Sequence, residues 1–147
     1  MAIYFHFQKP TILSNRKLLR SFIFKIFEYE NRTLAQLEYV FCDNDFLLNI
    51  NQTFLKHDYF TDVITFNLAD LDSLPIRGEI YISVEMVKQN SLHFRVSFAQ
   101  ELYRVIFHGI LHLCGYDDKK PQDKLVMKNK ENFYLAAFLD SINAITF

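Results

Sequence analysis

The feature that most constrains the fold is a repeated switch between two hydrophobic periods along the chain. In some segments apolar residues alternate as in half-buried strands, and in others they recur every three or four residues as on one face of a helix. Strands are predicted at residues 3–7, 34–43, 63–67 and 79–83, and helices near residues 14, 44, 84, 97 and 121. This order predicts an α+β fold in which a small mixed sheet of about four strands is covered by about five helices.

The expected helix starts carry residue types that favour a first turn. Ser14 and either Asn44 or Asp45 are expected as N-caps, because their side-chain oxygens can accept hydrogen bonds from free backbone N–H groups. Ser97 and Gln100 have the spacing of a capping box. These signals fix where three of the helices should begin.

The closing helix should begin at Pro121, since proline suits the first turn of a helix. The apolar residues expected to form its buried face are Phe133, Ala136, Ala137 and Leu139. No internal repeat or linker interrupts the sequence, so residues 1–147 are expected to form a single domain.

Composition narrows the class of protein. Half of the 147 residues are hydrophobic and 16 are phenylalanine, which predicts a sizeable aromatic core. The sequence has no apolar run long enough to span a membrane and no signal peptide, and its two cysteines suit a reduced, cytoplasmic protein. A net charge of −1 does not indicate nucleic-acid binding, but it is compatible with a local basic patch.

The strongest chemical signal is the run from His108 to Asp118. His108 and His112 are four residues apart, so on a helix their side chains lie only about 40° apart around the axis. Gly115 is expected to end this helix in a left-handed turn that brings Asp118 back towards the imidazoles. Two nitrogens and one oxygen, with one position left for water, are the ligands of a catalytic zinc site. The alternative is a pair of packed core histidines.

Two neighbouring residues refine this interpretation. Gly109 stands where a zinc peptidase of the HExxH type has its glutamate, so the general base of a peptidase is absent. Glycine inside a helix costs about 1 kcal/mol relative to alanine, and its presence predicts a close approach to the backbone. Cys114 is off the face of the two histidines and is expected to be a small core residue.

The run His108-Gly-Ile-Leu-His112-Leu-Cys-Gly-Tyr-Asp resembles the signature of the YbeY family, metal-dependent endoribonucleases of rRNA maturation. Residues 61–66 (TDVITF) and 78–83 (GEIYIS) are similar to two further family segments. Glu101, Arg104 and Val105 fall where the family leads into the histidine motif. The matches run in the right order from about residue 48 to residue 131.

The resemblance implies one Zn²⁺ per chain, held by His108, His112 and a third ligand that is usually histidine in the family. Position 118 is aspartate here, and Asp118 is preferred to Asp117 because the family has a non-ligand aspartate at the latter position. A carboxylate ligand lowers the positive charge of the site, so the metal should be a weaker Lewis acid.

The resemblance also implies a function: a single-strand-specific endoribonuclease acting in rRNA 3′-end maturation and ribosome quality control, in which zinc-activated water attacks the phosphodiester. The implied partners are precursor rRNA and ribosomal components, with no membrane and no nucleotide cofactor. The alternative is a ribosome-assembly binding factor in which the metal is largely structural.

One family position differs in a way that bears on substrate binding. The family usually has an arginine before its Thr-Asp-Val segment, and this chain has Leu55 there. Lys56 or His57 could replace that cation, or both could be exposed loop residues. Asp62 and Ser83 could face a cleft or act as turn and cap residues. No general base emerges. A phosphate-attracting role is also considered for the lysines that follow the motif, which are Lys119, Lys120, Lys124, Lys128 and Lys130.

Overall fold

The centre of the molecule is one four-stranded sheet. The structure, a computed structural model, describes residues 2–69 and 75–146. The strand order is β1-β2-β4-β3; β1, β2 and β4 are parallel, and β3 is antiparallel to β4. The strands are β1 (Ile3–Phe7), β2 (Leu34–Cys42), β3 (Val63–Asn67) and β4 (Ile76–Ser83).

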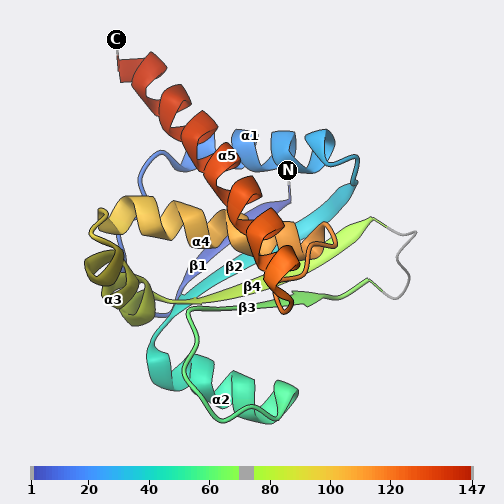
Figure 1. Ribbon diagram of the computed structural model, residues 1–147, viewed down its shortest axis with the longest axis vertical. Helices are drawn as coiled ribbons and strands as arrows, with labels where there is room; N and C mark the ends of the chain where they lie inside the picture. Colours follow the sequence, from blue (N-terminus) through green and yellow to red (C-terminus); the bar gives the residue numbers. More distant parts are fainter. Residues whose placement is uncertain (1, 70–74, 147) are drawn as a thin grey trace.

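Helices cover the two faces of the sheet unequally (Figure 1). The described part of the chain forms five: α1 (Arg16–Tyr29), α2 (Asn44–Leu55), α3 (Val84–Phe94), α4 (Phe98–Leu113) and α5 (Pro121–Thr146). Helices α1 and α4 pack on one face and α5 crosses outside them, while α2 lies below the other face. The predicted α+β fold, with a mixed sheet of four strands and five helices, is confirmed. None of the described helices is long and apolar enough to cross a membrane.

The main core lies between the sheet and α4. Tyr39 and Phe41 of β2 and Ile80 of β4 have no exposed surface and face this helix. The hydroxyl of Tyr39 donates a hydrogen bond of 3.1 Å to the carbonyl oxygen of Ile106, in the middle of α4. The helix that carries both histidines is therefore fixed to the most buried part of the sheet.

The capping box at the start of α4 is confirmed. The hydroxyl of Ser97 accepts a hydrogen bond of 3.1 Å from the backbone N–H of Gln100. At the start of α1 the prediction is wrong: Asn15, in a left-handed conformation with φ of 59°, is the N-cap and makes no side-chain cap bond. The carbonyl oxygen of Ser14 instead accepts a hydrogen bond from the hydroxyl of Tyr103.

The cap of α2 lies one residue earlier than predicted. Asp43, rather than Asn44 or Asp45, accepts a hydrogen bond of 2.8 Å from the backbone N–H of Phe46. Capping requires extended backbone at the cap residue, and Asp43 has it because it directly follows β2.

The expected buried face of α5 is wrong at two of its four positions; Ala137 and Leu139 are partly buried, and Leu139 packs against the core. Phe133 and Ala136 are exposed, and the buried stripe consists of Met127, Glu131, Tyr134 and Phe138. The stripe has helical spacing, but a carboxylate occupies one of its positions. The pattern of apolar residues alone therefore does not predict this stripe.

The close approach predicted at Gly109 is present. A Cβ atom added there would lie 2.8 Å from Cδ1 and 2.9 Å from Cγ2 of Ile80, which packs against the helix backbone from β4. Gly109 thus lets α4 sit close enough to the sheet for the core to close.

Gly109→Ala is therefore expected to lower the free energy of unfolding by up to about 2 kcal/mol. Overpacking costs about 1–3 kcal/mol, and the better helix propensity of alanine offsets about 1 kcal/mol. Urea unfolding measures the change. In an Ile80→Val background the same substitution should cost less, because Cδ1 is gone; equal costs in both backgrounds would mean that Ile80 is not the constraint.

Candidate metal centre

The last turns of α4 and the loop after it bring three ligand atoms together. Nε2 of His108 lies 3.0 Å from Nε2 of His112, and each lies 3.4 Å from Oδ2 of Asp118. These three residues could hold a metal ion, and all are partly buried.

A glycine turn returns Asp118 to the histidines, as the sequence predicted. Gly115 has φ of 102°; its N–H donates to the carbonyl oxygen of His112, and the N–H of Tyr116 donates to that of Leu111. This pair of bonds is a Schellman motif, which reverses the chain after a helix.

The separations fit a tetrahedral ion. Ligands about 2.0–2.2 Å from zinc at tetrahedral angles lie roughly 3.3–3.6 Å from one another. The three distances of 3.0, 3.4 and 3.4 Å in the cluster are close to that range. The donor set also suits a divalent metal, because imidazole nitrogen and carboxylate oxygen both bind zinc.

The Nδ1 atom of each imidazole is hydrogen-bonded to a group outside the cluster, and the Nε2 atom faces the cluster. Nδ1 of His112 lies 3.0 Å from the carbonyl oxygen of Tyr116, which can only accept, so this nitrogen carries the proton. Nδ1 of His108 donates a hydrogen bond of 2.6 Å to Oε2 of Glu131. Burial, with a contribution from His108, lowers the pKa of His112, which favours its neutral form. With the Nδ1 atoms directed at Glu131 and the carbonyl oxygen of Tyr116, the Nε2 atoms of both rings face Oδ2 of Asp118, where the three atoms could bind one cation.

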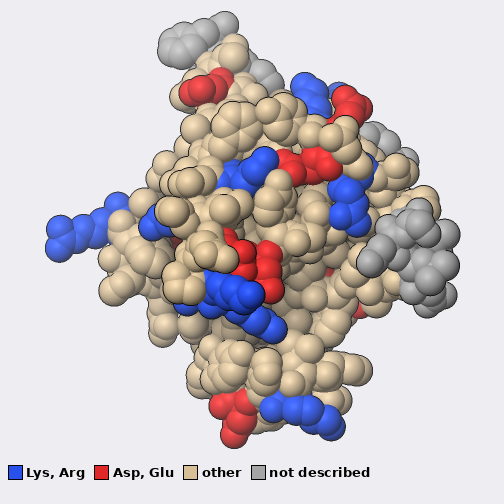
Figure 2. Space-filling view, turned by 45° about the vertical axis from the view of Figure 1, so that its right-hand side comes forward, with Lys and Arg blue, Asp and Glu red and all other residues tan. Residues whose placement is uncertain are grey.

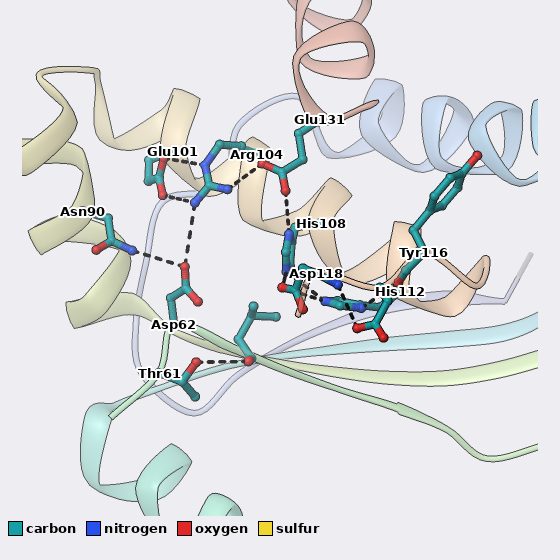
Figure 3. A network of polar contacts seen from close by, with 12 residues as sticks. Thr61, Asp62, Asn90, Glu101, Arg104, His108, His112, Tyr116, Asp118 and Glu131 are labelled. Atoms are coloured by element: carbon teal, nitrogen blue, oxygen red, sulfur yellow. Dashed lines mark hydrogen bonds and ion pairs between the residues drawn. The ribbon is translucent and has the colours of Figure 1, made fainter. Parts of the chain in front are cut away.

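A buried ionic network holds His108 from behind (Figure 3). Arg104 binds Glu131 at 2.7 Å and forms two bonds to Glu101 at 2.5 and 2.8 Å. Burial acts to raise the pKa of Glu131, but its bonds to His108 and Arg104 outweigh burial and lower it. Glu131 is therefore a carboxylate that accepts from His108, as in the carboxylate–histidine pairs of metal sites.

Asp62 extends the same network towards β3. Its Oδ2 lies 3.8 Å from Nη2 of Arg104 and accepts a hydrogen bond of 3.2 Å from Asn90. Burial raises the pKa of Asp62, although Arg104 opposes the shift. Ser83 has a structural role, since its hydroxyl accepts from the backbone N–H of Met86 and caps α3.

A second buried carboxylate, Glu30 at the end of α1, supports His112 indirectly. It accepts hydrogen bonds from Tyr116 at 2.6 Å, from Lys130 at 3.1 Å and from Tyr134. Tyr116 supplies the carbonyl oxygen that holds His112. Helix α5 thus contributes to the support of both histidines.

Two hollows meet at the cluster. One, of about 500 Å³, lies between α2 with the loop after it and the sheet, and a recess above the α2 lobe is visible in Figure 2. The other, of about 470 Å³, lies between the α3–α4 turn and α5. His108 and Asp118 line both.

The predicted substrate-binding residues lie at or near the α2 hollow. His57 lines it, and its ring stacks on that of Tyr59 at 5.2 Å between centroids. Leu55, where the family usually has arginine, also lines it. Lys56 is the left-handed C-cap of α2 and is exposed. A role for Lys56 and His57 in binding substrate stays a prediction.

Comparison with known proteins gives a family match over most of the chain. The profile of a family described as "Endoribonuclease YbeY" matches residues 6–139. The chain belongs to the YbeY family. A protein named endoribonuclease YbeY from Flavobacterium psychrophilum is 48% identical over 109 residues, covering 74% of this chain and 76% of the relative. One from Karelsulcia muelleri is 41% identical over 133 residues, covering 90% and 93%.

A solved structure supports the same fold. The solution structure of TM1509 from Thermotoga maritima is 27% identical, with a TM-score of 0.61, over 98% of this chain and 93% of that one. The resemblance to YbeY proteins inferred from the His108–Asp118 run is thereby confirmed, and it extends into the N-terminal third of the chain.

Sequence reasoning about this YbeY chain missed Glu131 altogether and gave no role to Arg104. Glu131 lies 23 residues after His108, and no motif joins them. The available signal was the helical spacing of Met127, Glu131, Tyr134 and Phe138, in which a charged residue interrupts an apolar stripe.

Glu131→Gln is expected to weaken metal binding by about 10- to 100-fold, the usual effect of altering a residue that orients a metal-bound histidine. Glutamine keeps the shape but removes the charge that holds the Nδ1 proton of His108. Competition with a chromophoric chelator measures the affinity. The exposed Glu28→Gln on α1 is the matched control; equal affinities of the two variants would contradict the role of Glu131.

Proposed function

We propose that this chain is a zinc-dependent endoribonuclease that cuts single-stranded RNA in rRNA 3′-end maturation and ribosome quality control. The observation that carries the proposal is the convergence of three acceptor atoms, on His108, His112 and Asp118, where two hollows meet. The endoribonuclease activity is proposed from the relatives, which are named endoribonuclease YbeY.

In the proposed mechanism, Zn²⁺ would be held by His108, His112 and Asp118. When bound, it supplies Lewis acidity towards a phosphoryl oxygen and lowers the pKa of a bound water. Glu131 and the carbonyl oxygen of Tyr116 keep both imidazoles in the tautomer whose Nε2 is free.

The proposed substrate contacts on the α2 side are cationic and aromatic. His57 and Lys119 line that hollow, where they can donate to phosphate oxygens, and Tyr59 offers a ring beside His57. Lys56 directly precedes His57 in the sequence and is proposed to act with it. The proposed partners are precursor rRNA and ribosomal components, in the cytoplasm, a location that the free thiols of Cys42 and Cys114 suit.

A second function is favoured by Leu55. Because an apolar side chain lines the hollow where the family usually places arginine, the site has one cation fewer for a phosphate. The alternative is therefore a ribosome-assembly factor that binds RNA or ribosomal protein and keeps a largely structural metal.

The test pairs metal analysis with cleavage of a single-stranded RNA, for the wild type and Asp118→Ala. About one zinc per chain, with metal and cleavage both lost in the variant, is expected. Asp117→Asn examines the neighbouring carboxylate, and the exposed Asp140→Ala is the control. If the wild type binds metal but does not cleave RNA, the assembly factor is favoured. If metal is lost in Asp117→Asn but not in Asp118→Ala, the third ligand is Asp117 and not Asp118.

A further inference from the structure

The groove between the α3–α4 turn and α5 has the size and lining of a binding site. Apart from the residues of the metal cluster and of the ionic network that supports it, the residues that line the groove have no role in the site described above. Its volume of about 470 Å³ is in the range of small-molecule sites. Phe94 and Val96 form one wall, although 56% and 39% of their surfaces are exposed. Its inner end is made by His108 and Asp118.

An enzyme that cuts inside a strand must hold nucleotides on both sides of the bond it breaks. A single hollow beside the metal would accommodate only one side. In this molecule the α2 hollow and the α5 groove share His108 and Asp118, so a strand that passes the cluster enters one as it leaves the other.

The groove offers a nucleobase an aromatic surface. Phe94 ends α3, lines the same groove as His108 and Asp118, and has more than half of its surface exposed. Every base has a π-face, so stacking on such a ring is independent of sequence. The side-chain amides of Gln100 and Asn132 also line the groove, and because each offers both donors and an acceptor, they can hydrogen-bond to the edge of any base.

The groove also offers charge to a phosphate. Lys124 and Lys128 line it one helical turn apart on α5, and within the described ranges neither is in an ion pair. The carboxylates of Glu101 and Glu131 in the same wall are bound by Arg104, which offsets part of their repulsion of a phosphate.

We propose that this groove binds one nucleotide adjoining the cleaved bond of a single-stranded RNA, with its base on Phe94 and its phosphate between Lys124 and Lys128. The inference rests on the proposed endoribonuclease function and adds to it a defined second half of the substrate site. Base recognition there is by stacking, so no single base is required.

A protein–RNA cycle tests the stacking. A fluorescein-labelled single-stranded RNA, with an abasic nucleotide placed at each position around the cleavage site in turn, is bound by wild type and Phe94→Ala. Anisotropy in EDTA gives Kd, and cleavage with metal gives kcat/KM. Phe94→Ala should weaken binding of the intact strand about 5- to 150-fold.

At one abasic position, the affinity of the wild type should fall by the same factor relative to the intact strand. The affinity of Phe94→Ala should be the same for that abasic strand as for the intact strand. Phe133→Ala, an aromatic of similar exposure on the other side of α5, should behave as the wild type. If cleavage is normal but the effects of Phe94→Ala and of the abasic nucleotide are additive at every position, the proposed nucleotide site in the groove is wrong. The proposed endoribonuclease function would still stand. No cleavage by metal-loaded wild type overturns the endoribonuclease, whereas the coupling in binding would still uphold the groove.

Salt dependence tests the phosphate contacts independently. For a single strand, each phosphate neutralised by the protein adds about 0.7 to the slope of log K against log salt. Because Lys124 and Lys128 are proposed to hold one phosphate, the double variant Lys124→Gln/Lys128→Gln should lower the slope by about 0.7. Lys17→Gln/Lys25→Gln, two exposed lysines of α1, should leave it unchanged; equal slopes for both pairs would remove the lysines from the site.

Discussion

His112→Ala is expected to release the metal, reduce RNA cleavage to background and leave the fold intact. The substitution removes one of three ligand atoms that lie 3.0–3.4 Å apart, and two ligands with no third hold a divalent ion weakly. His112 is partly exposed and α4 remains anchored through its buried residues, so far-UV circular dichroism should not change.

Thermal denaturation with and without Zn²⁺ gives a readout that does not depend on activity. A ligand that binds only the folded state at 1,000 times its Kd stabilises that state by about 4 kcal/mol. The wild type should show such a shift and His112→Ala should not. His6→Ala, which removes an exposed histidine of β1, is the control. A zinc-dependent shift of normal size in His112→Ala would contradict the assigned ligand set.

Arg104→Met is expected to lower the free energy of unfolding by about 3–5 kcal/mol near pH 7, the usual effect of removing one partner of a buried ion pair. Glu101 and Glu131 have only 2% and 6% of their side chains exposed, and both are bound by Arg104. Methionine fills part of the volume but leaves their charges unpaired. Urea unfolding in EDTA measures the effect without a contribution from metal.

The destabilisation should shrink as the pH falls. In the wild type the folded-state pKa of Glu131 lies below its usual value, so its stabilising contribution is present above that value and is lost on acidification. In the variant, Arg104 no longer opposes the effect of burial on Glu131, so the pKa of Glu131 rises relative to the wild type. The penalty is therefore largest at high pH and is relieved as Glu131 protonates.

Adding Glu101→Gln and Glu131→Gln to Arg104→Met should restore part of the stability at neutral pH, because no unpaired charge then remains buried. A loss below about 1 kcal/mol in Arg104→Met, with no dependence on pH, would show that the network is not a stability element.

The three candidate metal ligands could be found from the sequence because they are close together in it. His108 and His112 share one face of a single helix, and Gly115 has the conformation that a reversal after the helix requires. Local geometry alone then brings Asp118 to them. The same holds for the capping box of α4 and for the strand and helix types, which follow from hydrophobic period.

The sequence was less informative where an element's face depends on what packs against it. The buried stripe of α5 contains Glu131, which is stable there only because Arg104 and His108 of α4 meet it. The left-handed Asn15 at the start of α1 is another such case: asparagine tolerates this conformation, but its side-chain amide also donates to the hydroxyl of Tyr103, 88 residues away.

By itself, then, the sequence determined the order and type of the elements and the three atoms that could hold a metal, since each depends on residues within about one or two helical turns. Only the tertiary structure decided that Glu131 holds His108, that Lys130 and Tyr134 reach Glu30 behind Tyr116, and where the proposed second half of the substrate site lies. Those contacts join residues 23 to 104 positions apart, and they exist because α5 folds back over α4 and α1.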